Sequence, residues 1–432
     1  MERMLGVYIS VPFCKAKCSY CNFASGVLGA GTSGAERIDR YIERVCAEIR
    51  SARTRAAELS TELPGQVDTV YFGGGTPSLL SAEQMRRLFA ALRGEFEVAA
   101  DAEITLECAP GQLGEETLDE LLRQGMNRVS FGVQSFVDAE ARAVGRLHTR
   151  VMCLAEIARM RTVGVQEINV DLIVGLPRQT AGSWHESVDV ALESAVPHVS
   201  VYMLEVDEDS RLGREILLGG IKYGASDVSG DDAIAEWYAA ACEWLETGGV
   251  MQYEISNFAR KNERGLSGWK GKDIDGDSDS SSQNGAAVSG TDHRSRHNLK
   301  YWRREPYVGF GLDAHSMLRI GAGALRWANA DELDKYEAQG SRFEGPEVEW
   351  IGREKGFEEA MFLGLRMSEG VGLEALRAEF GETLMQGAVA ALDDVEQAEL
   401  VAREGSRVRL TARGRMVSNE VFSRLLVETP VG

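Results

Sequence analysis

Hydrophobic and polar residues follow two alternating patterns along the first half of the chain. Short apolar runs rich in Val, Ile, Tyr and Phe occupy residues 4–11, 67–73, 102–107, 127–133, 166–175 and 198–204. Amphipathic segments of helical period lie between them, at residues 36–58, 81–93, 114–125 and 151–164. Repeated units of this kind predict six parallel strands joined by crossover helices.

An α/β fold follows from this pattern, and two architectures are compatible with it. Six units fit an incomplete (β/α)6 barrel of the TIM type better than an open doubly wound sheet, although the pattern alone does not separate them. We expect this core barrel to span residues 1–260. In both folds the functional residues gather at the carboxyl ends of the strands, so the polar residues there are candidates for chemistry.

The pattern of hydrophobic and polar residues changes in the second half of the chain. Residues 261–292 lose hydrophobic periodicity and include DIDGDSDSSSQNG, which predicts a disordered acidic insertion. Asp273, Asp275, Asp277 and Asp279 only faintly resemble a calcium loop, because Ser278 and Asn284 stand where glycine and glutamate are needed. We expect residues 293–345 to connect the core barrel to the C-terminal domain. Residues 346–432 show two helical patterns, a short strand, a turn and a last helix, which predict a winged-helix-like α+β domain.

Composition narrows the class of protein. The 432 residues are 44% hydrophobic, enough for a large core, and no apolar run approaches the roughly 20 residues of a membrane-spanning helix. We therefore expect a soluble, cytoplasmic protein, with peripheral membrane association left open. The formal charge of −20 argues against binding to nucleic acid, and the C-terminal domain has no dense basic helix, so packing or partner docking is its expected role.

Three cysteines in CKAKCSYC, Cys14, Cys18 and Cys21, directly follow the first apolar run. Three thiolates can hold three corners of a cuboidal iron–sulfur cluster and leave one iron open for a small molecule. A zinc knuckle is an alternative, but it needs a fourth ligand, and the next cysteine, Cys46, falls in a helical stretch. Disulfides are disfavoured by the odd count of seven cysteines, and Cys46, Cys108, Cys153 and Cys242 are interpreted as small core residues.

Further polar residues stand at the ends of the predicted strands. The sequence YFGGGTPS contains Gly74, Gly75 and Thr76, and glycines there allow the backbone to approach a ligand closely. We expect this loop to hold the amino-acid part of a cofactor through its backbone groups and Thr76. Glu107, Gln134, Arg146 and Asp171 follow at later strand ends or just beyond them, and each alone is more often a cap or a surface charge. Asp171 interrupts an apolar strand, so a polar partner should meet it.

The motifs CxxxCxxC, GGGTP, GVQSF and DLIVGLP, in this order, resemble the radical S-adenosylmethionine (SAM) superfamily. More narrowly, the chain from about Met4 to its C-terminus is similar to the oxygen-independent coproporphyrinogen III oxidase group. The resemblance implies a 4Fe–4S cluster on the three cysteines, with its open iron chelated by SAM. It also implies a SAM pocket, whose residues would be Tyr8, Tyr20, Gly74, Gly75, Thr76, Glu107, Gln134, Arg146, Asp171 and Glu205.

Two features of the sequence favour one half of that group. The decarboxylating oxidases are known for CxxxCxxCxC and an N-terminal extension, whereas this chain has Phe23 at the last cysteine position and begins thirteen residues before Cys14. Both features resemble the HemW-type haem chaperones. Their haem motif, HNxxYW, is matched by SRHNLKYW, which implies haem contacts from His297, Asn298, Tyr301 and Trp302. Alternatively, these are a hydrogen-bonded loop histidine and ordinary core aromatics.

The resemblance leads us to expect a haem-binding protein on a radical SAM scaffold, which passes haem to haem proteins such as respiratory cytochromes. Whether SAM is cleaved during transfer does not follow from these residues. The alternative is oxidative decarboxylation of coproporphyrinogen III to protoporphyrinogen IX, and a radical SAM reaction on another substrate is a third reading. The loop GLDAHS, which includes His315, departs from the GPGAHS expected from the family.

Overall fold

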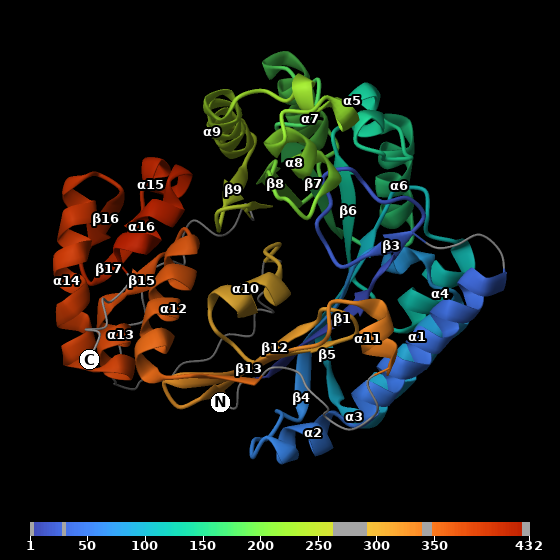
Figure 1. The fold of residues 1–432 in the computed structure, drawn as a ribbon, viewed down its shortest axis with the longest axis horizontal. Helices are drawn as coiled ribbons and strands as arrows, with labels where there is room; N and C mark the ends of the chain where they lie inside the picture. The colour runs from blue at the N-terminus through green and yellow to red at the C-terminus, as the bar shows by residue number, and fades with distance from the viewer. Residues whose placement is uncertain (1–3, 28–31, 262–291, 339–347, 426–432) are drawn as a thin grey trace, which may run out of the picture.

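The computed structural model describes residues 4–27, 32–261, 292–338 and 348–425 (Figure 1). The predicted acidic insertion, with its faint likeness to a calcium loop, lies outside the described residues except for its two end positions, 261 and 292.

The six predicted parallel strands are all present. They are β1 (Leu5–Val11), β4 (Gln66–Gly74), β5 (Glu97–Cys108), β6 (Arg128–Gln134), β7 (Glu167–Val174) and β8 (His198–Met203). Each pairs in parallel with the next, in the order in which they occur along the chain. A doubly wound sheet would reverse its strand order at a switch point. The uninterrupted order therefore selects the barrel.

The sheet continues beyond these six strands on both sides. On one side β11 (Tyr307–Phe310) pairs in parallel with β1, followed by the antiparallel strands β12 (His315–Ile320), β13 (Gly323–Ala328) and β14 (Val348–Ile351). On the other side β10 (Asn257–Arg260) and β9 (Val250–Gln252) are antiparallel. In the part of the chain that the structure describes, β14 and β9 end this sheet without pairing with each other. The barrel is therefore incomplete, as predicted.

Helices cover the outer face of the barrel (Figure 1). They are α1 (Thr32–Arg50), α2 (Ala52–Glu58), α3 (Ala82–Glu95), α4 (Glu115–Arg123), α5 (Asp138–Ala143), α6 (Arg150–Thr162), α7 (Ala181–Glu193), α8 (Arg211–Leu217) and α9 (Asp231–Thr247). The helical segment predicted at 36–58 is two helices separated at Ser51. Helix α3 begins with a capping box, in which Ser81 and Gln84 satisfy each other's backbone N–H groups. Two 3-10 turns, Pro77–Leu79 and Lys222–Asp227, complete this layer.

The C-terminal residues form an α+β unit with a hydrophobic core of its own. It contains α12 (Arg353–Arg366), β15 (Val371–Gly372), α13 (Leu373–Phe380), α14 (Glu382–Gln397), β16 (Val401–Glu404), β17 (Arg407–Leu410), α15 (Ala412–Met416) and α16 (Ser418–Arg424). Its three strands form a small antiparallel sheet in the order β15-β17-β16. The α+β character agrees with the sequence-based prediction.

Helix α10 (Arg296–Trp302) lies between the barrel and the C-terminal unit (Figure 1). It carries the sequence HNLKYW, and it was not foreseen as a helix. The short helix α11 (Leu333–Ala338) packs near α1 through the ion pair between Arg37 and Asp334, 2.7 Å long.

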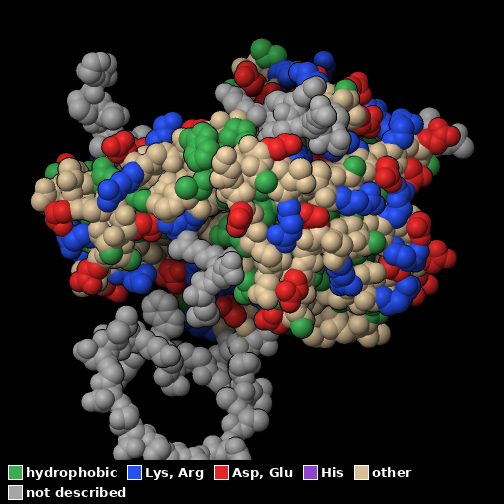
Figure 2. Space-filling view, turned by 90° about the horizontal axis from the view of Figure 1, so that it is seen from below, with side chains coloured by type: hydrophobic (Ala, Val, Ile, Leu, Met, Phe, Trp, Pro, Cys, Tyr) green, Lys and Arg blue, Asp and Glu red, His purple; other side chains and the backbone are tan. Residues whose placement is uncertain are grey.

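On the face shown in Figure 2, Lys and Arg side chains alternate with Asp and Glu, and no basic area dominates. Within the described residues, no helix is both long enough and apolar enough to cross a membrane.

Candidate functional site

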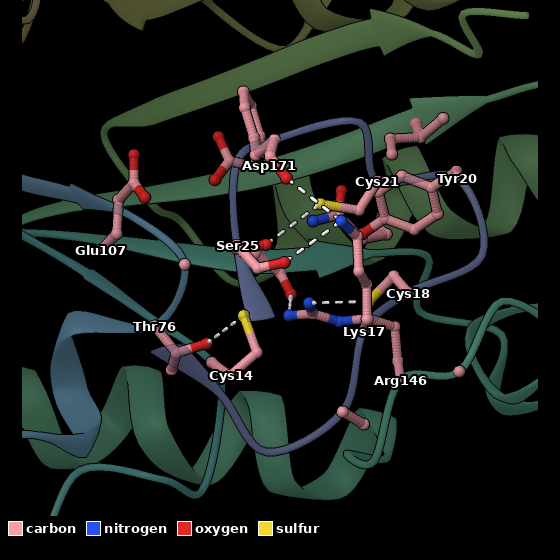
Figure 3. A pocket seen from close by; sticks show the side chains of 18 of the residues that line it. Cys14, Lys17, Cys18, Tyr20, Cys21, Ser25, Thr76, Glu107, Arg146 and Asp171 are labelled. Atoms are coloured by element: carbon pink, nitrogen blue, oxygen red, sulfur yellow. Dashed lines mark hydrogen bonds between the residues drawn. The ribbon is translucent and has the colours of Figure 1, made fainter. Parts of the chain in front are cut away.

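The three cysteines lie in one loop that leaves the carboxyl end of β1. The loop is bounded by the short paired strands β2 (Phe13–Cys14) and β3 (Gly26–Val27). Cys14, Cys18 and Cys21 have free thiols and line a single cavity of about 340 Å³ at the carboxyl ends of the barrel strands. Figure 3 shows their sulfur atoms turned into the same cavity as the carboxylates of Glu107 and Asp171.

Each of the three sulfur atoms contacts a different polar side chain. The pairs are Thr76 Oγ1 with Cys14 Sγ at 3.5 Å, Arg146 Nη1 with Cys18 Sγ at 3.6 Å, and Ser25 Oγ with Cys21 Sγ at 3.9 Å. Hydrogen bonds to sulfur are a normal feature of protein iron–sulfur sites. No three His, Cys, Asp or Glu side chains of the described residues are grouped closely enough to hold one metal ion. The donor set therefore fits a multinuclear cluster, in which each thiolate binds its own iron, better than a zinc knuckle.

The glycine loop packs against the cysteine loop. The backbone N–H of Gly75 donates to the Val11 carbonyl at 2.9 Å, and that of Thr76 donates to the Phe13 carbonyl at 2.8 Å. A Cβ at Gly75 would lie 2.8 Å from the Phe13 nitrogen, so only glycine permits this approach. The Gly74 N–H donates to Glu107 Oε2 at 3.2 Å.

These contacts narrow the choice of backbone groups that could hold a cofactor. The three N–H groups of the loop already have partners in the protein, so they are not the groups that would hold the amino-acid part of a cofactor. Backbone carbonyl oxygens remain as acceptors, and an ammonium group needs acceptors.

Two half-buried carboxylates, Glu107 of β5 and Asp171 of β7, face the cavity. Burial, and then the charge of Asp171, raise the pKa of Glu107 to about 7. Burial also raises the pKa of Asp171, although its carboxylate accepts hydrogen bonds from Ser130 Oγ at 2.9 Å and Asn169 Nδ2 at 2.8 Å. The polar partner predicted for Asp171 is thus present. Perturbed pKa values of this kind are concentrated at functional sites.

The remaining predicted SAM residues divide into two groups. Tyr20, Gln134, Arg146 and Glu205 line the cavity together with the glycine loop. Gln134 has a φ of 69°, rare for a residue with a side chain, and such backbone strain is concentrated at functional sites. The buried Nε of Arg146 has no hydrogen-bond partner among the described residues. Tyr8, in contrast, does not line this cavity.

The haem-motif residues lie elsewhere, at the opposite end of the barrel strands. His297, Asn298, Tyr301 and Trp302 are all on α10, and none lines the cavity. His297 is only 1% exposed. Its Nδ1 is 2.8 Å from Thr69 Oγ1 and its Nε2 is 2.8 Å from the Tyr301 hydroxyl, so both ring nitrogens are occupied.

Burial, and then the charge of Lys300, lower the pKa of His297 to about 3, which keeps its ring neutral. This conformation matches the alternative interpretation of the motif, in which His297 is a hydrogen-bonded residue among packed aromatic side chains. It differs from that interpretation in that His297 lies in a helix, not in a loop.

Sequence reasoning missed several residues of the cavity wall. Tyr71, Gly132, Ser130, Ile173 and Met203 line it together with the predicted residues. Ser130 could have been found from strand alternation, because it lies four residues before Gln134, a predicted residue at the carboxyl end of the same strand. Tyr71 lies three residues before Gly74, so alternation from the predicted glycines does not point to it.

Comparisons with known proteins agree with the fold. The sequence profile of the radical SAM superfamily matches residues 8–191, and that of the HemN C-terminal domain matches residues 353–417. The structure of the coproporphyrinogen III oxidase HemN from Escherichia coli superposes with a TM-score of 0.77, at 21% identity, over 99% of this chain and 91% of that chain. At this identity the likeness shows the fold alone.

Relatives of similar length carry a more specific name. The heme chaperone HemW of Bacillus subtilis is 30% identical over 98% of this chain and 100% of its own length. The heme chaperone HemW of Lactococcus lactis is 28% identical over 99% of both chains, and that of Escherichia coli is 28% identical over 74% of this chain and 72% of its own.

The barrel and its three-cysteine cavity thus define a radical SAM protein, a class whose members use a 4Fe–4S cluster and SAM. Within that class, the chain belongs to the HemW family.

Proposed function

We propose that this protein is a haem chaperone, which binds haem and transfers it to haem proteins, on a radical SAM scaffold. The observation that carries the proposal is the match to proteins named heme chaperone HemW along essentially the whole chain, including the segment with HNLKYW. Respiratory cytochromes in or at a membrane are the class of recipient that we propose, with the chaperone itself in the cytoplasm.

The cavity residues fit the two resident cofactors of the class. Cys14, Cys18 and Cys21 would hold the 4Fe–4S cluster, and the free donor of Arg146 and the two half-buried carboxylates would complete the SAM pocket. When bound, the cluster supplies an electron to SAM or to another acceptor. Glu107 and Asp171 would offset the positive charge of SAM. Arg146 and Thr76 would donate hydrogen bonds to the cysteine thiolates that hold the cluster.

We propose His297 as the haem ligand, with Asn298, Tyr301 and Trp302 around the porphyrin. Histidine is the usual protein donor to haem iron, and aromatic rings can stack on a porphyrin face. In the conformation described here both nitrogens of His297 are hydrogen-bonded, so ligation requires α10 to shift and release one of them.

An anaerobic haem titration of the cluster-reconstituted protein tests the proposal. Saturable binding at one haem per chain, seen in the Soret region and weakened by His297→Ala, is the expected result. His315→Ala is a matched control, because His315 is exposed and lies outside α10. Absence of specific haem binding would reject the chaperone function.

The oxidase alternative is tested in the same preparation. Phe23 stands where the oxidases have a further cysteine, and its side chain is exposed at the cavity, so no fourth thiolate is supplied there. We expect no protoporphyrinogen IX from coproporphyrinogen III in the presence of SAM and a reductant. Formation of the decarboxylated product would instead support the function of a coproporphyrinogen III oxidase.

A further inference from the structure

Helix α10 packs against the amino-terminal part of the barrel through polar contacts with Asp68 of β4 and Glu103 of β5. Glu103 of β5 accepts hydrogen bonds from the backbone N–H groups of Arg296 and His297, at 3.0 Å each. Lys300 lies 2.7 Å from Asp68 of β4, with only 3% of its side chain exposed. The helix is therefore fixed to the barrel wall by its amino-terminal turn and by a buried ion pair.

The strands that hold α10 also reach the SAM pocket. Alternate residues of a strand face the same side of a sheet. On β4, Thr69 contacts His297, while Tyr71, two residues further, lines the cavity. On β5, Glu103 caps α10, while Glu107, four residues further, lines the cavity. The haem motif and the SAM pocket are thus two ends of the same interior barrel surface.

Stacked rings fill the space between these two ends. The ring centroids of His297 and Tyr71 are 5.1 Å apart with an interplanar angle of 25°. Tyr8 stacks on both, with centroid distances of 6.0 Å to Tyr71 and 6.4 Å to His297. This arrangement explains why Tyr8 lies away from the cavity wall, since its ring supports Tyr71 from within the barrel.

Tyr71 and Glu107 line the same cavity, and each of these two side chains affects the pKa of the other. The carboxylate of Glu107 also accepts a hydrogen bond from the N–H of Gly74 at 3.2 Å. On the side of these groups that faces Gly73 there is little free space, because a Cβ at Gly73 would lie 2.9 Å from both Glu107 Oε1 and Tyr8 Cε2. A shift of the Tyr71 ring therefore changes the position of Glu107, since densely packed groups transmit displacement.

We propose that His297 is a positioning residue of the SAM pocket, acting through the stack on Tyr71 and thereby on Glu107. It follows that ligation of haem iron by His297, which withdraws the ring from this stack, opposes SAM binding. The second statement rests on the proposed haem-chaperone function, whereas the first does not. Because coupling between two binding sites is reciprocal, SAM weakens haem binding by the same factor by which haem weakens SAM binding.

The positioning role is tested by SAM affinity in the haem-free, cluster-reconstituted protein, measured anaerobically by equilibrium dialysis. His297→Ala removes the ring, and we expect the Kd for SAM to rise about 3- to 10-fold, which corresponds to the loss of one aromatic stack. His297→Phe keeps a ring against Tyr71 but cannot bind iron, and its Kd should stay within about twofold of the wild type. His185→Ala, a half-exposed ring on the outer helix α7, is the matched control.

The SAM-induced change in the electron paramagnetic resonance spectrum of the reduced cluster gives a second readout. It should be reduced at limiting SAM in His297→Ala and preserved in His297→Phe. Equal affinity for SAM in the wild type and His297→Ala, or equal weakening in the Ala and Phe variants, overturns the positioning role.

The antagonism is tested by repeating the dialysis with one equivalent of haem. In the wild type, haem should raise the Kd for SAM by a similar 3- to 10-fold, whereas in His297→Phe it should have no effect. This arm holds even where His297→Ala does not fold. An unchanged Kd in wild-type protein that carries haem on His297 overturns the antagonism. Failure of haem to bind at all refutes the proposed function instead, and the comparison of the Ala and Phe variants still decides the positioning role.

Discussion

Glu103 should determine how firmly α10 is held in the barrel. Glu103→Gln removes the negative charge that receives two backbone N–H groups at 3.0 Å and, more distantly, Ser295 Oγ at 3.4 Å. A hydrogen bond to a charged group contributes about 1.5–3 kcal/mol, and glutamine keeps one acceptor oxygen. Because part of the interaction survives, we expect the opening free energy of α10 to fall by about 2 kcal/mol, or roughly 30-fold in its opening equilibrium.

Native-state hydrogen exchange measures this opening locally, without assuming that the whole chain unfolds in one step. Amides of residues 297–302 in Glu103→Gln should exchange roughly 30-fold faster than in the wild type. Glu83→Gln is the matched control, because it makes the same change at a side chain that is 66% exposed and lies in the first turn of α3, not beside α10. Protection of α10 that is equal in the two variants would refute the reasoning, since it would mean that the Glu103 carboxylate adds nothing to the stability of α10.

Four other outcomes are expected. Because burial raises the pKa of Glu107 to about 7, and cationic SAM favours its charged form, SAM affinity should rise with pH from about 6 to about 8, and Glu107→Gln should show a flat profile by dialysis. In the ligand-free protein, the stability linked to Glu107 should fall as the pH rises from about 4.5 to about 7, because the folded state keeps a proton that the unfolded chain releases near its usual pKa of 4.5. A melting temperature of the wild type that rises over this range, relative to that of Glu107→Gln, would contradict this expectation. Cys18→Ser should abolish the brown cluster absorbance while Cys46→Ser, buried in α1, retains it; full iron content in Cys18→Ser would disprove the ligand assignment. Arg366 lies 4.3 Å from the Trp302 ring centroid, so a double-mutant cycle of Arg366→Met and Trp302→Leu should give a coupling energy of about 1 kcal/mol, and strictly additive effects would contradict a cation–π contact.

The six parallel strands could be predicted because each is an uninterrupted apolar run between amphipathic segments. The seventh parallel strand, β11, is only four residues long, YVGF, and pairs with β1 across about 300 residues of sequence. Local periodicity contains no information on such a partner. The same reason explains α10, since RHNLKYW is only seven residues long and is held by contacts with Asp68, Glu103 and Thr69, far away in the chain.

The candidate site was predicted in its parts but not in its arrangement. The positions of Cys14, Cys18 and Cys21 follow from their spacing, and those of Glu107 and Asp171 from the rule that carboxyl ends of parallel strands share one edge. The raised pKa of Glu107 does not follow from sequence, because it depends on burial and on a second carboxylate contributed by another strand. The location of His297 was also open, since its sequence gives the residue types of a haem motif but not their exposure.

By itself, then, the sequence determined the class of fold and the family, because these depend on local period, spacing and motif order. Tertiary structure alone decided that the strand order is sequential and that the haem motif forms a helix buried at the other end of the barrel from the three cysteines. It also placed the ring of His297 against Tyr71, which lines the cavity together with Glu107. The physical reason is that side chains distant in the chain become neighbours only when strands pair and close around a common interior, where burial fixes both their contacts and their charge.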